Sequence, residues 1–96
     1  MIYWGADMLI RRHIIFWGQV QGVGFRYRAS HAARMYGCTG WCRNEWDGSV
    51  TMEIQGTEES IGKVILAIER GTYIHIENIE SRTIPVTEGE YGFGTE

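Results

Sequence analysis

The stretch GQVQGVGFR, residues 18–26, separates a strand pattern from a helix pattern with three glycines in seven positions. Before it, MLIRRHIIFWGQV is rich in β-branched and aromatic residues, which predicts a strand near residues 8–19. Glycine in a structured segment costs backbone entropy, so such a cluster indicates positive φ angles or a close approach of the main chain to something. We therefore expect a strand, a constrained loop and a helix in succession.

Two segments carry apolar residues at helical spacing. The first runs from residue 25 to residue 36 and is followed by Gly37, a typical C-terminal stop. The second follows Thr57, which predicts an N-cap with two glutamates in the first turn, and Gly71 ends it. The apolar positions are Phe25, Ala29, Ala32, Ala33 and Tyr36 in the first helix and Ile61, Val64, Ile65 and Ile68 in the second.

The remaining patterns predict strands. TGWCRN and SVTMEIQG flank EWDG, and the pair Asp47-Gly48 is a strong signal for a tight turn, so residues 39–56 predict a hairpin. YIHIENIESRTI, residues 73–84, predicts a fourth strand, with Pro85 after it. A short fifth strand at 90–94 is weakened by two glycines.

The order is β-α-β-β-α-β, which predicts an α+β, ferredoxin-like fold with an antiparallel sheet and two helices on one face. We find no linker or repeat, so residues 1–96 are expected to form a single domain. Apolar residues make up 44% of the chain and charged residues 22%, typical of a globular protein.

Localisation and partners follow from the apolar runs and the charge. No apolar run approaches the roughly 18 residues of a membrane span, and MIYWGADMLI lacks the pattern of a signal peptide, so a cytoplasmic protein is expected. Residues 1–44 carry six arginines and one acid, for +5, whereas residues 45–96 carry three basic residues and eleven acids, for −8. The glycine loop lies in the positive half, which favours a small anion as partner over nucleic acid.

The two cysteines and three histidines indicate neither a disulfide nor a metal site. On one strand, Cys38 and Cys42 would stand roughly 13 Å apart, too far to be bridged, so both are expected to be small buried hydrophobic residues. The histidines are scattered through the sequence. We expect no metal and no cofactor.

The glycine loop can bind an anion through its main chain. Several N–H groups of residues 20–25 would lie at a helix N-terminus, where they lack intrahelical partners, and the Arg26 guanidinium would stand near them with a planar fork of donors. The loop matches neither the dinucleotide-binding pattern nor the P-loop. A tight turn with a surface arginine is the alternative interpretation.

The segments GQVQGVGFR, GWCRN, DGSV and IQG resemble the acylphosphatase family in order and spacing, from about His13 to Arg82. The resemblance implies the same ferredoxin-like fold and hydrolysis of the carboxyl–phosphate bond of acyl phosphates without a metal or a phosphoenzyme. It also implies that Arg26 binds the phosphate and that Asn44 positions the attacking water. The loop residues that would bind the substrate are Val20, Gln21, Gly22, Val23, Gly24 and Phe25.

Other interpretations compete with an acylphosphatase. Taken alone, Asn44 is typical of a turn that opens a hairpin. Carbamoyl-phosphate-processing domains of the hydrogenase-maturation type carry a similar loop, but a proline usually follows the arginine there, whereas this chain has Tyr27. A non-catalytic module that binds an anion or RNA is the third possibility, although SVTMEIQG lacks the RNA-binding aromatic pattern. We expect a monomer that acts on a small acyl phosphate.

Overall fold

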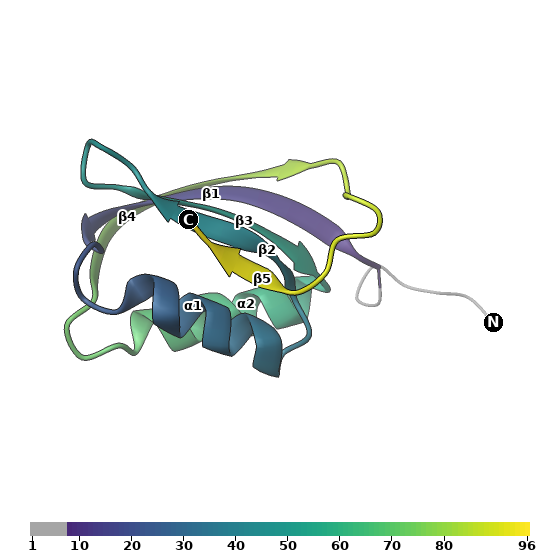
Figure 1. The fold of residues 1–96 in the computed structure, drawn as a ribbon, viewed down its shortest axis with the longest axis horizontal. Helices are drawn as coiled ribbons and strands as arrows, with labels where there is room; N and C mark the ends of the chain where they lie inside the picture. Colours follow the sequence, from purple (N-terminus) through teal and green to yellow (C-terminus); the bar gives the residue numbers. More distant parts are fainter. Residues whose placement is uncertain (1–7) are drawn as a thin grey trace.

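The computed structural model describes residues 8–96 and confirms the predicted order of elements (Figure 1). The elements are β1 (Ile10–Gln19), α1 (Phe25–Met35), β2 (Thr39–Asn44), β3 (Val50–Gly56), α2 (Glu58–Glu69), β4 (His75–Ile84) and β5 (Phe93–Thr95). β4 begins two residues later than predicted because residues 72 and 73 form a turn closed by a hydrogen bond from Ile74 N to Gly71 O, 3.2 Å.

The five strands form one sheet in the order β4-β1-β3-β2-β5. The pairs β1–β3, β1–β4 and β2–β3 are antiparallel, as predicted, and the short β5 adds a parallel pair with β2, so the sheet as a whole is mixed. The direction of β5 follows from the order of the strands. β4 runs opposite to β2, and a strand that enters the sheet at the end where β4 stops must run along β2 in the same direction.

Both helices pack on one face of the sheet and bury the core between the two layers (Figure 1). Alternate residues of the strands point into this layer, and residues three or four positions apart meet them from the helices, as the periodicities require. Each fully buried large side chain contributes roughly 1.5–3 kcal/mol of hydrophobic stabilisation. Core residues include Ile14, Phe16, Ala29, Ala33, Met52, Ile54, Ile61, Val64 and Ile68.

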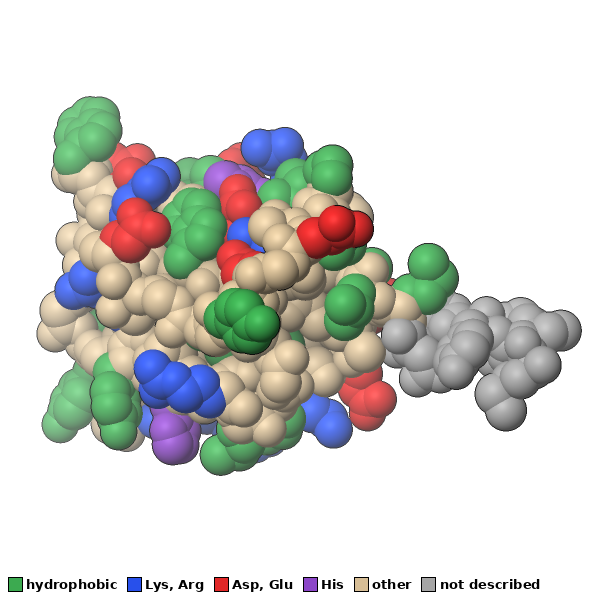
Figure 2. Space-filling model, turned by 45° about the vertical axis from the view of Figure 1, so that its right-hand side comes forward, with side chains coloured by type: hydrophobic (Ala, Val, Ile, Leu, Met, Phe, Trp, Pro, Cys, Tyr) green, Lys and Arg blue, Asp and Glu red, His purple; other side chains and the backbone are tan. Residues whose placement is uncertain are grey.

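The charge asymmetry along the sequence is not kept in space. Arg11 pairs with Glu53 and Glu90, and Arg43 pairs with Glu45, so basic residues of the first half meet acidic residues of the second. On the face shown in Figure 2, acidic and basic side chains are intermixed and the hydrophobic ones stand in separate groups. Between residues 8 and 96, neither helix has the length and apolar character needed to cross a membrane.

Candidate active site

The glycine loop forms one wall of a hollow of about 200 Å³ at the N-terminus of α1. Gly22 and Gly24 have φ angles of 70° and 84°, in the left-handed region that costs other residues roughly 1–2 kcal/mol. A Cβ atom at either position would meet no atom within 4 Å, so glycine is required by the backbone angle rather than by lack of space. The hollow is lined by Val20, Gly22, Gly24, Phe25, Arg26, Tyr27 and Asn44.

The loop is tied to the body of the protein at three points. Val20 and Phe25 are buried at its two ends, and the Phe25 ring packs edge-on against Phe16 with the centroids 4.9 Å apart. Between them, Gln21 Nε2 donates hydrogen bonds to the main-chain oxygens of Glu45 and Ser49, at 2.7 and 2.8 Å. These bonds connect the loop to the β2–β3 hairpin.

Main-chain N–H groups are available in the hollow. Within residues 8–96, the N–H groups of residues 21–24 donate to no main-chain carbonyl, and the first bond of α1 is from Arg28 N to Gly24 O, 3.0 Å. Helix α1 has no side-chain cap and no acidic residue in its first turn, whereas α2 has Thr57 as cap and two glutamates. The positive end of α1 is therefore left for an outside anion.

Asn44 faces this end of α1 from the last residue of β2. Its amide oxygen is buried and, among the buried side-chain polar atoms of the described chain, it alone has no hydrogen-bond partner. A buried polar atom without a partner costs roughly 1–3 kcal/mol of stability. Such a cost points to a function for the free acceptor.

Arg26 lies half-buried in the first turn of α1. Its Nη1 donates to the main-chain oxygen of Glu96 at 2.7 Å, which holds one branch of the guanidinium beside the end of β5. The Glu96 N–H in turn donates to the Cys42 carbonyl at 2.9 Å. The guanidinium has five N–H donors in all, so this contact leaves donors for a ligand in the hollow.

Ionisable groups that could act as a base are not part of the hollow. Its described lining holds no carboxylate and no imidazole. Glu45 follows Asn44 in the chain, but hydrogen bonds, first from Thr51 and then from Arg43, lower the pKa of its carboxylate. The site therefore offers main-chain donors, one arginine and one amide acceptor.

The structure brings most of the residues predicted from the sequence together. Val20, Gly22, Gly24, Phe25, Arg26 and Asn44 all line the hollow. Gln21 and Val23 do not: the Gln21 side chain binds the hairpin, and Val23 packs against the core.

Two parts of the site were missed in the sequence. Tyr27 lines the hollow, and the main-chain oxygen of Glu96 binds Arg26. The position of Tyr27 in the first turn, beside Arg26, was an available signal, whereas nothing in the sequence marked Glu96.

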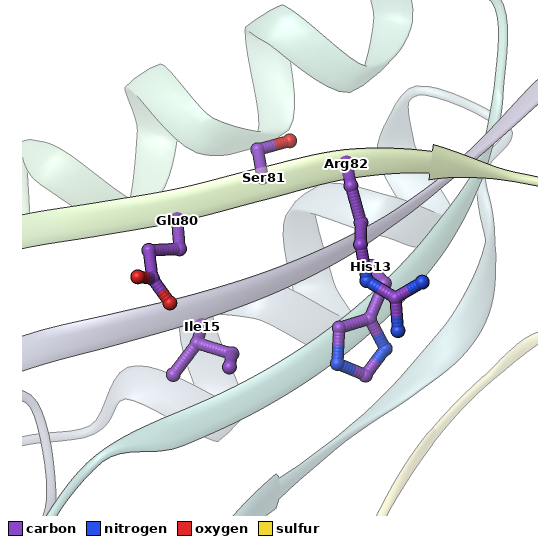
Figure 3. A pocket seen from close by; sticks show the side chains of 5 residues that line it. All are labelled: His13, Ile15, Glu80, Ser81 and Arg82. Atoms are coloured by element: carbon purple, nitrogen blue, oxygen red, sulfur yellow. The ribbon is translucent and has the colours of Figure 1, made fainter.

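A larger hollow, of about 400 Å³, lies on the sheet face opposite the helices. Its side chains from β1 and β4 are shown in Figure 3, where His13 and Arg82 lie close together and Ser81 points to the opposite side of the sheet. The described lining of this hollow comes from β1 and β4 and includes no residue of the glycine loop or of a helix. No group of three His, Cys, Asp or Glu residues in the described part of the chain could hold a metal ion.

Comparisons with known proteins identify the family and the fold. The family model of acylphosphatase matches residues 12–95. An acylphosphatase of Clostridium beijerinckii is 37% identical over 86 residues, which cover 88% of this chain and 96% of that protein. The crystal structure of acylphosphatase from Bacillus subtilis has a TM-score of 0.83 and 31% identity and covers 93% of this chain and 99% of that one.

A second type of protein shares the fold. The structure of full-length HypF in the phosphate- and nucleotide-bound form has a TM-score of 0.82 and 28% identity, over 93% of this chain but 12% of that one. The family model that matches most of this chain is that of acylphosphatase, and the relatives of similar length are acylphosphatases. The chain belongs to the acylphosphatase family of enzymes, which hydrolyse acyl phosphates.

Proposed function

We propose that this chain hydrolyses acyl phosphates by direct attack of water on phosphorus in the hollow at the N-terminus of α1. Arg26 and the loop amides bind the phosphoryl group, and Asn44 orients the water. The observation that carries the proposal is the buried Asn44 amide oxygen, which has no partner and faces a set of unpaired N–H donors.

Phosphoryl transfer requires stabilisation of the charge on three equatorial oxygens. The N–H groups of the loop and the positive end of α1 supply hydrogen bonds to these oxygens without having to move. Arg26 adds a planar pair of donors with a full positive charge. The Gln21 bonds to the hairpin keep the loop and Asn44 at a constant separation.

The amide oxygen of Asn44 accepts a hydrogen bond from the attacking water, so a lone pair of the water points at phosphorus. An amide does not take up a proton at neutral pH, so Asn44 is not a base. As the new phosphorus–oxygen bond forms, the bond from phosphorus to the carboxyl oxygen breaks and its electron pair leaves on the carboxylate. The proton of the water passes to a phosphoryl oxygen, and the products are a carboxylate and inorganic phosphate.

No general acid is needed because a carboxylate is a good leaving group. The positive charge that other phosphoryl-transfer enzymes take from magnesium comes here from Arg26 and the helix end. All of these groups come from one chain, so we propose a metal-independent monomer acting on small acyl phosphates.

The test is hydrolysis of benzoyl phosphate, followed by ultraviolet absorbance, in water enriched in oxygen-18 and with or without EDTA. We expect turnover that EDTA does not change and the heavy oxygen in inorganic phosphate. Heavy oxygen in benzoate would show attack on the carbonyl carbon and contradict the mechanism. A folded protein without turnover would contradict the function.

A further inference from the structure

Arg11 is 3% exposed although it lies on the sheet face that the helices leave uncovered. Its Nε binds Glu53 Oε1 at 3.1 Å, and its Nη1 and Nη2 bind the two oxygens of Glu90 at 2.8 and 3.2 Å. A buried cation costs several kcal/mol unless it is fully paired. Glu90 lies on the connection between β4 and β5, residues 85–92, which we call the crossing segment (Figure 1, the yellow-green loop).

The crossing segment is bound along one row of side chains. Arg11, Gln55 and Thr39 are direct neighbours across β1, β3 and β2, so they lie on the same face. Gln55 Nε2 donates to Thr87 O at 2.9 Å, and Thr87 N donates to Gln55 Oε1 at 2.8 Å. Arg11 holds Glu90 further along the segment through both carboxylate oxygens.

These polar contacts, rather than apolar packing, hold the segment on the sheet. Residues 85–89 are exposed, and residues 86–90 line a hollow of about 470 Å³ together with Leu9, Thr39 and Gln55. The bonds from Gln55 to Thr87 and from Arg11 to Glu90 join the segment to the sheet directly. We call the pairs Arg11–Glu90 and Gln55–Thr87 the clamp.

The crossing segment leads directly to the partner of Arg26. Gly40 N donates to Gly92 O at 3.1 Å, and Phe93, which follows, is buried against β2. Three residues later the main-chain oxygen of Glu96 accepts the bond from Arg26 Nη1. β5 has only three residues, and the clamp holds the segment that immediately precedes it.

We propose that Arg11 and Gln55 are positioning residues for Arg26. By holding the crossing segment, they set β5 on β2 and keep the Glu96 oxygen where it orients the guanidinium toward the phosphate. The inference rests on the proposed function, since Arg26 matters here as the phosphate ligand. A displacement of a positioned group by about 1 Å can cost a factor of roughly 100 in rate.

The test compares Glu90→Gln with Glu88→Gln, which removes the same charge from an exposed position of the same segment. We measure KM and kcat for benzoyl phosphate, the affinity for inorganic phosphate by calorimetry, and the midpoint of urea unfolding. Glu90→Gln should weaken phosphate binding and raise KM about tenfold, and Glu88→Gln should change neither. A fall in the urea midpoint with unchanged KM and phosphate affinity would reduce the clamp to a structural role and overturn the inference.

The double variant Glu90→Gln/Arg26→Ala tests whether the clamp acts through Arg26. In the Arg26→Ala background, Glu90→Gln should have no further effect on phosphate affinity, whereas additive losses would contradict the inference. If Glu90→Gln does not fold, Gln55→Met replaces it in the same measurements. This substitution removes the bonds to Thr87 while the side chain keeps a similar volume. Phosphate affinity tests the clamp even if the wild type fails to hydrolyse benzoyl phosphate, so failure of the inference and failure of the function are distinguishable.

Discussion

Arg26 and Asn44 line one hollow, Arg26 from the first turn of α1 and Asn44 from the last residue of β2. The two side chains are chemically opposite, because the guanidinium only donates hydrogen bonds and the buried amide oxygen only accepts them. The donors of Arg26 suit an anion, and the acceptor of Asn44 suits a water molecule. We therefore expect substitutions at the two positions to have separable effects on phosphate binding and on rate.

Replacement of Arg26 by lysine should weaken phosphate binding. Lysine keeps the charge but loses the planar fork, and the loss of a hydrogen bond to a charged group costs about 1.5–3 kcal/mol, or roughly tenfold or more in affinity. The measurement is competitive inhibition of benzoyl phosphate hydrolysis by inorganic phosphate. Arg34→Lys, exposed on the same helix, is the control, and equal inhibition constants for the two variants would contradict a role for the fork.

Gly24→Ala should destabilise the fold and Gly62→Ala should stabilise it. Gly24 caps α1 at a φ of 84°, where alanine costs roughly 1–2 kcal/mol. Gly62 lies exposed inside α2 with no atom within 4 Å of a new Cβ, so alanine gains up to about 1 kcal/mol there. Urea unfolding measures the change in the free energy of unfolding for each variant. A change of the same sign in both variants would show that the backbone angle does not explain the glycine at position 24.

The fold could largely be predicted from the sequence because its patterns are local. The turn at Asp47-Gly48 and the cap at Thr57 each act over a few residues, and the structure has both. The direction of β5 depends on bonds to residues far away in the chain. Arg11 illustrates the same limit, because its partner Glu90 is 79 positions away and nothing in the sequence predicted its burial.

The candidate site, like the fold, could be predicted from the sequence only in part. Arg26 and Asn44 belong to motifs with specific spacing, so both could be named before the structure was known. The role of Gln21 depends on the hairpin carbonyls that fold back onto the loop, and these have no sequence signature. Contacts made by main-chain atoms, such as the Glu96 oxygen, are independent of the side chain and so leave no signal.

Stability should fall in acid through Glu53 and Glu90. Burial raises the pKa of each carboxylate, but hydrogen bonds from His13 and Arg11 to Glu53, and from Arg11 and Thr39 to Glu90, outweigh it and leave both pKa values below the ordinary 4.5. A lowered folded-state pKa stabilises the protein above the ordinary value, and this stabilisation is lost as the pH falls through the lowered one.

Urea midpoints between about pH 6 and pH 3 measure this loss. We expect the midpoint of the wild type to drop across the acid part of this range and the drop to be smaller in Glu90→Gln. Parallel curves for the two proteins would show that Glu90 does not contribute to the acid sensitivity.

The cysteines should be unreactive in the folded protein. Both are buried, and burial raises the pKa of Cys38 to about 11 and of Cys42 to about 12, so both thiols stay protonated at neutral pH. Titration with a thiol reagent such as DTNB should detect no rapid reaction in the native protein and two thiols in guanidinium chloride. Fast modification of the native protein at pH 8 would contradict the burial.

The central claim is that Asn44 holds the attacking water while Arg26 and the loop hold the phosphate. The most direct measurement is kcat for benzoyl phosphate in Asn44→Ala, with inhibition by inorganic phosphate in the same assay. We expect kcat to fall by a factor of about 100 or more while the inhibition constant stays within about twofold of the wild-type value. An unchanged kcat, or a loss of phosphate affinity in step with the rate, would contradict the claim.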